Sequence, residues 1–308
     1  MPKSVILDVD TGVDDAFALL YAVRNPELKV LGITCVDGNT HLDQVCRNTL
    51  YVIDAAEAGN IPVAAGARHP LMGSSGHAEH VHGNDGLGGH SKPVTNRSLD
   101  KRHAIELIKD LVNESTEPVT LIPVGPLTNI ALFIATYPEV AKKLEGILLM
   151  GGSASMGNVT ATAEFNIWHD PEAAHVVFNS GLPITMYGLD VFYELGVTQS
   201  HIDELRKSPS TSAQLAADLV EFRYGSMGSE ITLGDYGAVA SFLYPELTTS
   251  KVMNVAVDVT NGLNRGQTIC DKRPNETELY PNQIGKPCKV ILSVQKEEMV
   301  KRWIEVVK

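Results

Sequence analysis

The chain has 308 residues and carries 37 aspartates and glutamates against 25 lysines and arginines, which gives a formal net charge of −12 at pH 7. An acidic protein repels phosphate backbones, so this charge argues against a nucleic-acid polymer as partner and leaves a small neutral or cationic ligand open. No apolar run approaches the length of a membrane span, and the first residues lack the apolar core of a signal peptide, so we expect a cytoplasmic protein with no membrane partner.

Short apolar runs alternate with helical patterns along the chain. The apolar runs predict strands at residues 5–9, 30–36, 61–65, 119–124, 146–150, 183–187, 251–259 and 288–294. The intervening patterns predict helices at 13–24, 42–58, 99–112 and 171–179. This alternation is typical of an α/β fold with an open, mainly parallel central sheet, helices on both faces and an active site at the carboxyl ends of the strands.

Two irregular stretches interrupt the alternation, at residues 66–97 and 261–286. The first holds six glycines between Gly73 and Gly89 and four histidines between His77 and His90. A loop of this length in a compact α/β unit is usually functional or disordered. No change in composition marks a boundary, so we expect residues 1–308 to form a single domain.

Four aspartates follow the first predicted strand and open the first predicted helix: Asp8, Asp10, Asp14 and Asp15. Carboxylates this close repel one another, so they need hydrogen bonds or a cation. Ca²⁺ and Mg²⁺ prefer oxygen ligands, and the intervening Gly12 allows the backbone to turn the carboxylates inward. The alternative is that Asp8 and Asp14 are ordinary turn and cap residues at the surface. The cluster as a whole favours a metal or substrate site.

A strand that ends in DxD also opens phosphatases of the haloacid-dehalogenase type. In that interpretation Asp8 would be the nucleophile and Mg²⁺ the metal. The surrounding motifs contain few lysines and arginines, which a phosphate site needs.

A longer series of motifs resembles another family, the inosine-uridine preferring nucleoside hydrolases. The segment DVDTGVDDAFALL at Asp8–Leu20 is similar to the N-terminal signature of that family. Further similar motifs follow in order: DGN at Asp37–Asn39, HGNDGLGG at His82–Gly89, VGPLTNIAL at Val124–Leu132, MGG at Met150–Gly152 and GNVTATAEFNIWHDPEAA at Gly157–Ala174. The resemblance runs from Val5 to about Pro245, with weaker matches at Gly266, Thr268, Asp271 and Arg273.

This resemblance implies Ca²⁺-dependent hydrolysis of the N-glycosidic bond of a ribonucleoside, which yields free base and ribose. It implies that the ion is bound by Asp10, Asp15, Asp235 and the backbone carbonyl of Val124. Such an oxygen-only set suits Ca²⁺ independently of the family. Asp10 would be the general base that deprotonates a metal-bound water. The family also implies a homodimer or homotetramer.

The resemblance also assigns the substrate contacts. The expected ligands are polar side chains and two neighbours of the sugar and base, namely Asp14, Asn39, His82, Met150, Asn158, Glu164, Phe165, Asn166 and Asp235. Carboxylates in such a pocket also stabilise the positive charge of a ribosyl oxocarbenium ion. Each asparagine taken alone would be interpreted as a turn or cap residue; the joint pattern favours binding.

His82 lies in the glycine-rich loop, and the resemblance places a histidine of that loop near the substrate. We expect a mobile lid that brings His82 to the site. His77, His80 and His82 together could suggest a Zn²⁺ site, but their spacing matches no common zinc pattern and no cysteine accompanies them.

The sequence departs from the family pattern at Gly234. Many members have a histidine before the last metal ligand, which helps the base to leave, and glycine cannot donate a proton. Proton donation is worth about 10² to 10⁴ in rate. The candidates for its replacement are His82, Tyr224, Tyr236, or a substrate whose base leaves more easily. A further alternative is a ribonucleoside-binding protein with little hydrolytic activity.

Overall fold

The computed structural model describes residues 2–74, 76–94, 96–227, 231–273 and 283–308. Each of the eight strands expected from the apolar runs is confirmed, because each run forms a strand of one large sheet. Within these residues that sheet has nine strands, in the order β10 (Thr268–Cys270), β9 (Thr248–Val257), β11 (Lys286–Val294), β6 (Ile184–Tyr187), β5 (Gly146–Met150), β4 (Val119–Pro123), β1 (Lys3–Val9), β2 (Leu28–Cys35) and β3 (Val63–Ala65).

The sheet is mainly parallel, as the alternation of strands and helices predicts. Every neighbouring pair from β6 to β3 runs parallel, as does the pair of β11 with β6, while β9 pairs antiparallel with both β11 and β10. A separate antiparallel pair joins β7 (Gly196–Val197) to β8 (Ile231–Thr232). The strands β7, β8 and β10 were not expected from the sequence, since two or three residues are too few to show a periodic pattern.

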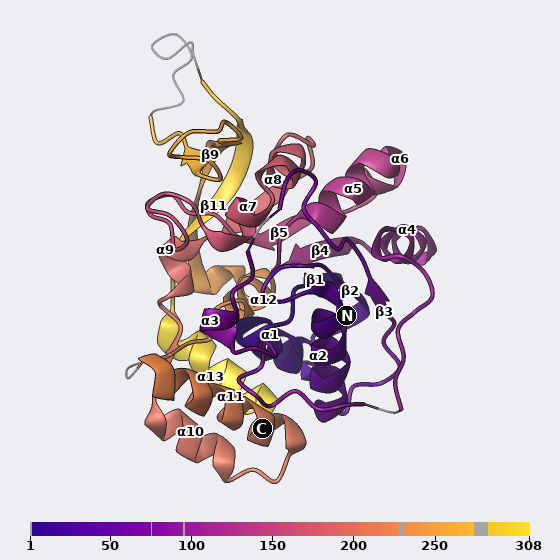
Figure 1. Ribbon diagram of the computed structural model, residues 1–308, viewed down its shortest axis with the longest axis vertical. Helices are drawn as coiled ribbons and strands as arrows, with labels where there is room; N and C mark the ends of the chain where they lie inside the picture. Colours follow the sequence, from indigo (N-terminus) through magenta and orange to yellow (C-terminus); the bar gives the residue numbers. More distant parts are fainter. Residues whose placement is uncertain (1, 75, 95, 228–230, 274–282) are drawn as a thin grey trace.

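The helices fill the connections between strands (Figure 1). They are α1 (Val13–Arg24), α2 (Leu42–Ala55), α3 (Glu79–His82), α4 (Ala104–Glu114), α5 (Thr128–Thr136), α6 (Pro138–Ala141), α7 (Phe165–His169), α8 (Pro171–Phe178), α9 (Leu189–Phe192), α10 (Gln199–Arg206), α11 (Thr211–Met227), α12 (Tyr236–Leu243), the 3₁₀ turn Pro245–Leu247 and α13 (Lys296–Val307). None of the helices in the described part of the chain is long and apolar enough to cross a bilayer.

Alternating side chains of the central strand β1 divide the core into two layers. Val5, Leu7 and Val9 pack with residues of α1, α2, α11, α12 and α13 on one face. Ile6 points the other way, into a cluster with residues of α4, α5 and α8. The sheet is therefore covered by helices on both faces, and its parallel strands are buried as such sheets require.

The strand order turns at β1. Chain connections run from β1 outward to β2 and β3 on one side, and then return to β4, β5 and β6 on the other side. Helices leave opposite faces of the sheet at this point, so a crevice opens at the carboxyl ends of β1 and β4, where open α/β sheets bind ligands. The aspartate cluster follows β1, and Val124 follows β4.

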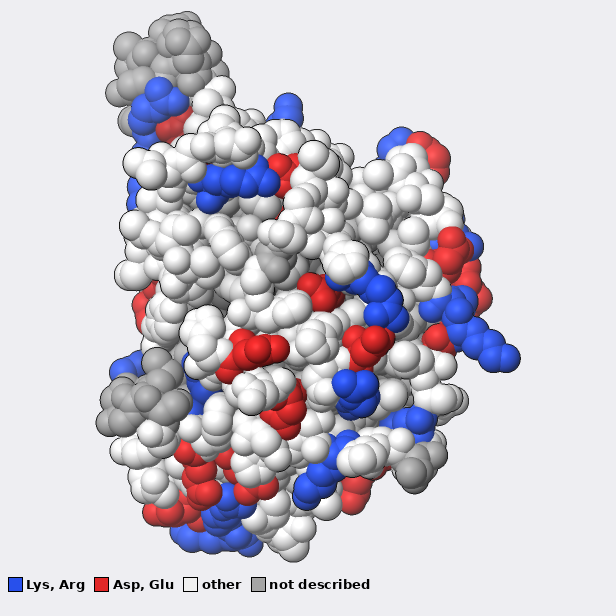
Figure 2. Space-filling view, in the orientation of Figure 1, with Lys and Arg blue, Asp and Glu red and all other residues white. Residues whose placement is uncertain are grey.

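Charged side chains of both signs are interspersed on the face of the molecule that Figure 2 shows. Some of them form ion pairs, as Arg206 does with Asp218 and Glu221. Part of the excess negative charge is buried instead, and among these buried acids are Asp10 and Asp15 at the end of β1.

Candidate active site

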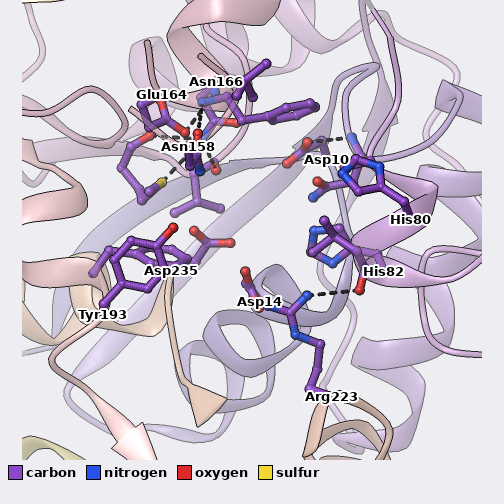
Figure 3. A pocket seen from close by; sticks show the side chains of 18 residues that line it. Asp10, Asp14, His80, His82, Asn158, Glu164, Asn166, Tyr193, Arg223 and Asp235 are labelled. Atoms are coloured by element: carbon purple, nitrogen blue, oxygen red, sulfur yellow. Dashed lines mark hydrogen bonds between the residues drawn. The ribbon is translucent and has the colours of Figure 1, made fainter. Parts of the chain in front are cut away.

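A pocket lies at the carboxyl ends of β1, β4 and β5. Figure 3 shows Asp10, His80 and His82 on one side of it, Asn158, Glu164 and Asn166 on the other, and Asp14 and Asp235 between them. The lining includes these predicted site residues: Asp10, Asp14, Asn39, His82, Val124, Met150, Asn158, Glu164, Phe165, Asn166 and Asp235. Among the predicted site residues, only Asp15 lies behind the pocket surface in the described structure.

Asp10 is held at the pocket wall by the backbone of the loop after β2. Its Oδ2 accepts a hydrogen bond of 2.7 Å from the backbone N–H of Asn39. Gly38 and Gly125 lie directly against this carboxylate, and a Cβ atom on either residue would overlap one of its oxygens. Burial, and secondly the charge of Asp15, raises the pKa of Asp10 well above its ordinary value.

Asp15 supports this wall from the first turn of α1. Its Oδ1 accepts from the backbone N–H of Asp10 at 3.1 Å, and its Oδ2 accepts from Gly12 N at 2.9 Å and from Asn39 Nδ2 at 3.1 Å. Asp15 is fully buried, and this burial raises its pKa to about 6. The side chain therefore ties the start of α1 to the loops that carry Asp10 and Asn39.

Asp14 and Asp235 complete a group of buried acids. Oδ1 of Asp14 is buried and has no hydrogen-bond partner among the described residues. Asp235 is 4% exposed, and its pKa is raised well above the ordinary value by burial and then by the charges of Asp15, Asp14 and Asp10. Because these carboxylates disfavour one another's ionisation, a cation among them would stabilise their charged forms.

The opposite wall is built around the start of α7. Glu164 caps this helix: its Oε1 accepts from Asn166 N at 2.8 Å, and its Oε2 accepts from Gly152 N at 2.9 Å. Burial raises the pKa of Glu164 to about 7. Asn166 Nδ2 donates to the carbonyls of Val124 at 2.7 Å and Met150 at 3.1 Å, which fixes the ends of β4 and β5 to this wall.

Asn158 and Phe165 belong to the same wall. The backbone N–H of Phe165 donates to Asn158 Oδ1 at 2.9 Å, so the loop before α7 folds back on the helix start. Both side chains line the pocket. The predicted ribose ligands thus come together from segments that are distant in the sequence.

His82 enters the pocket from α3, a short helix within the glycine-rich segment. Its Nδ1 accepts a hydrogen bond of 3.1 Å from the backbone N–H of Val13, which places its remaining ring proton on Nε2. His82 is 5% exposed, and burial lowers its pKa to about 4, so the ring is neutral at pH 7. His80 also lines the pocket, whereas His77 Nε2 pairs with Asp37 at 3.2 Å outside it.

Two candidates for the missing proton donor are wrong. The hydroxyl of Tyr236 donates to the carbonyl of Met299 at 2.7 Å within the core, and Tyr224 packs against the same core. Neither side chain is part of the pocket lining. Of the three side chains that the sequence offered for this role, His82 faces the pocket.

Asp8 also lies away from the pocket, which contradicts the idea that all four clustered aspartates converge there. It shares the face of β1 that carries Ile6, where its Oδ1 accepts from Thr34 Oγ1 at 2.5 Å and from Asn129 Nδ2 at 2.8 Å. Burial raises the pKa of Asp8 to about 7. A residue enclosed in this way is not placed to attack a phosphate, which removes the geometric basis of the phosphatase interpretation.

The donors around Asp10 suit a hard cation in chemistry. Asp10, Asp14, Asp15 and Asp235 offer only oxygen, and the Val124 carbonyl retains a second lone pair beside its bond from Asn166. Within the described residues, however, no three His, Cys, Asp or Glu side chains are already spaced around one point as metal ligands. The fit therefore rests on oxygen donors and on the unpartnered Asp14 Oδ1, and a bound ion would have to draw the carboxylates together.

Sequence reasoning missed several residues of the pocket, above all Val81, Phe192, Tyr193 and Arg223. Arg223 had a usable signal, because it follows the buried Ala216 and Leu219 of the same helix by seven and four residues and so shares their face. Phe192 and Tyr193 reach the pocket from the end of α9, and no motif marks them.

Comparisons with known proteins show which family the chain is similar to. The family model described as inosine-uridine preferring nucleoside hydrolase matches residues 5–301. Pyrimidine-specific ribonucleoside hydrolase RihA from Shewanella baltica (strain OS155) is 41% identical over 280 residues, which cover 88% of this chain and 87% of the relative. RihA from Photobacterium profundum is 40% identical, with 88% and 90% covered.

Solved structures show the same likeness. The plant nucleoside hydrolase PpNRh1 superposes with a TM-score of 0.92 at 30% identity and covers 100% of this chain and 99% of its own. A purine-preferring ribonucleoside hydrolase from Gardnerella vaginalis gives a TM-score of 0.90 at 32% identity, with 99% and 98% covered.

Proposed function

The chain belongs to the inosine-uridine preferring nucleoside hydrolase family and is a ribonucleoside hydrolase, and from that premise we propose that it cleaves pyrimidine ribonucleosides with a bound Ca²⁺ and with Asp10 as general base. The observation that carries the proposal is the group of buried carboxylates that follow β1 and precede α12, with Asp10 held at the pocket wall. The pyrimidine preference is supported by the RihA relatives, whose names call them pyrimidine-specific.

In this proposal Asp10, Asp15, Asp235 and the carbonyl of Val124 hold the ion. Bound there, Ca²⁺ would supply positive charge that acidifies a water and binds ribose hydroxyls. The Asn39 N–H fixes the Asp10 carboxylate, which takes the proton of the attacking water on a carboxylate oxygen.

The remaining polar residues act on the sugar. Asp14, Asn39, Asn158, Glu164 and Asn166 bind the hydroxyl groups of ribose, with Met150 beside them. Glu164 is orientated by two backbone N–H groups of its own helix, so its carboxylate keeps one position as charge develops. Acidic side chains around the ring favour the oxocarbenium-like transition state over the neutral substrate.

A panel of purine and pyrimidine ribonucleosides, assayed for reducing sugar with and without a chelator, tests this function. We expect ribose release from uridine or cytidine that stops on chelation and returns when Ca²⁺ is added back. Asp10→Ala is expected to stay folded and lose turnover, while Asp8→Asn, which changes an acid outside the pocket, serves as the matched control. Unchanged turnover in Asp10→Ala, or wild-type activity that persists after chelation, would contradict the proposal.

Three expectations from the sequence stay predictions. A single domain would be measured as one cooperative unfolding transition of the whole chain. A homodimer or homotetramer would be measured by light scattering of the purified chain. A cytoplasmic location would be measured by fractionating cells that produce it.

A further inference from the structure

If the proposed function holds, the departing base needs a group in the pocket that stabilises the negative charge it acquires. When the glycosidic bond breaks, its electron pair goes to the base. A proton donor or a fixed positive charge on that side of the pocket therefore lowers the barrier.

The wall at Gly234 supplies neither a proton donor nor a fixed positive charge. Gly234 has φ of +51°, and a Cβ atom there would stand 2.6 Å from Cζ of Phe192 and 3.1 Å from Cβ of Asp14. The ring of Phe192 therefore occupies the space into which a side chain at 234 would project. Because this ring carries no acidic proton, help for the base must come from another wall.

A buried arginine stands on the wall beside His82. Arg223 is 6% exposed and lines the pocket together with Asp14, His82 and Tyr193. Its Nη1 donates to the carbonyl of Val81 at 2.9 Å, which ties α11 to α3, the short helix that carries His82. Figure 3 shows the side chain rising from α11 with its guanidinium between Asp14 and His82.

The charge of Arg223 acts within the pocket. It contributes to lowering the pKa of His82 on one side, and it opposes the raised pKa of Tyr193 on the other. A guanidinium keeps its charge at any working pH and offers several N–H donors in one plane.

The other groups nearby are less suited to stabilising the charge of the departing base. His82 is neutral at pH 7 and can offer a single N–H from Nε2. Tyr193 is half exposed, with 51% of its surface accessible to water. The remaining charged groups of the lining, Asp10, Asp14, Glu164 and Asp235, are acids. Arg223 is thus the permanent cation of the described pocket lining.

We propose that the Arg223 guanidinium binds the 2-oxo group of a pyrimidine ribonucleoside and stabilises the base as it leaves. Water forms the new C–O bond at the anomeric carbon and gives a proton to Asp10, while the bond from that carbon to N1 breaks and its electron pair passes to N1 and the adjacent 2-oxo oxygen. The free base then takes a proton from solvent, which balances the proton received by Asp10.

This role selects for pyrimidines. Both uracil and cytosine carry an oxygen on the carbon next to the glycosidic nitrogen, whereas purines have none on either carbon next to theirs. In a purine the atom in the corresponding position is the ring nitrogen N3, which has one in-plane lone pair where the 2-oxo oxygen has two. A guanidinium placed to donate two N–H groups to that oxygen therefore favours the pyrimidine transition state.

The test compares two substrates of the Ca²⁺-supplemented protein: uridine, and 4-nitrophenyl β-D-ribofuranoside, whose leaving group stabilises its own charge. By analogy with removal of one oxyanion donor, Arg223→Gln is expected to lower kcat for uridine about 10²-fold and kcat for the nitrophenyl riboside less than about threefold. Arg223→Lys keeps the positive charge but lacks the planar set of N–H donors of the guanidinium. It should retain more uridine activity than Arg223→Gln.

Arg206→Gln is the matched control, because Arg206 pairs with Asp218 and Glu221 at the protein surface, away from the pocket. It is expected to leave both substrates unchanged. Equal losses on the two substrates in Arg223→Gln would overturn the inference and would mean that Arg223 serves to hold Val81 in place. Full uridine activity in Arg223→Gln would also overturn the inference. If the glutamine variant does not fold, a selective loss on uridine in Arg223→Lys supports the inference and an equal loss overturns it. Absence of uracil release by the wild-type protein would instead overturn the proposed function itself.

Discussion

Gly38 lies directly against the Asp10 carboxylate, and replacing it with alanine tests whether the position of that carboxylate sets the rate. A Cβ atom on residue 38 would overlap Oδ2 of Asp10 and stand 2.8 Å from its Cβ and Cγ. Real Cβ contacts essentially never fall below 3.0 Å, so the carboxylate must retreat by about 1 Å. That movement breaks the 2.7 Å bond from Asn39 N.

A displacement of about 1 Å in a catalytic group costs about 10²-fold in rate, or about 2.7 kcal/mol in the barrier. We therefore expect Gly38→Ala to lower kcat for uridine about 10²-fold, measured as reducing sugar released at saturating Ca²⁺. Gly59→Ala is the control, since a Cβ atom there meets no atom within 4 Å. If Gly38→Ala folds, binds Ca²⁺ and keeps kcat within about twofold, the reasoning about Asp10 is refuted.

Three further predictions concern Asp8, Asp15 and His82. Asp8→Asn should keep uridine hydrolysis, since the amide oxygen can accept the bonds of Asn129 and Thr34; loss of activity in the folded variant would bring Asp8 back as a catalytic group. Asp15→Asn should reduce the rise in Tm that Ca²⁺ causes by binding the folded state, and an unchanged rise would remove Asp15 from the ligand set. Burial lowers the pKa of His82 from 6.5 to about 4, so the unfolded chain binds the proton first as pH falls. The wild type should therefore lose up to about 3 kcal/mol of stability between pH 6.5 and 4 relative to His82→Asn in urea unfolding, and identical pH slopes would contradict this.

Much of the fold was predictable because the relevant signals are local. The central parallel strands β1, β4 and β5 are buried along nearly their whole length, so they stand out as short apolar runs. The eight predicted runs correspond to β1 to β6, β9 and β11. The first helix was placed at its observed bounds, Val13–Arg24. The predicted helix at 99–112 instead begins at Ala104, where His103 Nδ1 accepts from Ile105 N at 3.4 Å and caps it.

The site was predictable where its residues lie next to one another in motifs. Asp10 directly follows β1, Asp14 lies in the first turn of α1, and Asn39 lies in the loop after β2, so all three are close to strand ends that meet at one edge of the sheet. Asp8 was misplaced because its closeness in sequence to Asp10 was given more weight than the alternation of β1, which puts it on the face of Ile6.

The base side of the pocket depends on contacts between distant segments. Phe192 fills the space beside Gly234 only because α9 and the turn before α12 meet in the folded chain. No residue pattern near Phe192 or Gly234 in the sequence predicts that contact. The leaving-group partner therefore could not be identified from the sequence alone.

The most direct test of the account is the initial rate of ribose release from uridine by wild-type protein and Asp10→Asn, each measured after chelation and again after Ca²⁺ is restored. We predict that the wild type is active only with Ca²⁺, and that Asp10→Asn stays inactive in both states, even at Ca²⁺ concentrations high enough to raise its Tm. Wild-type activity that survives chelation, or a Ca²⁺-loaded Asp10→Asn that hydrolyses uridine at the wild-type rate, would contradict the central claim.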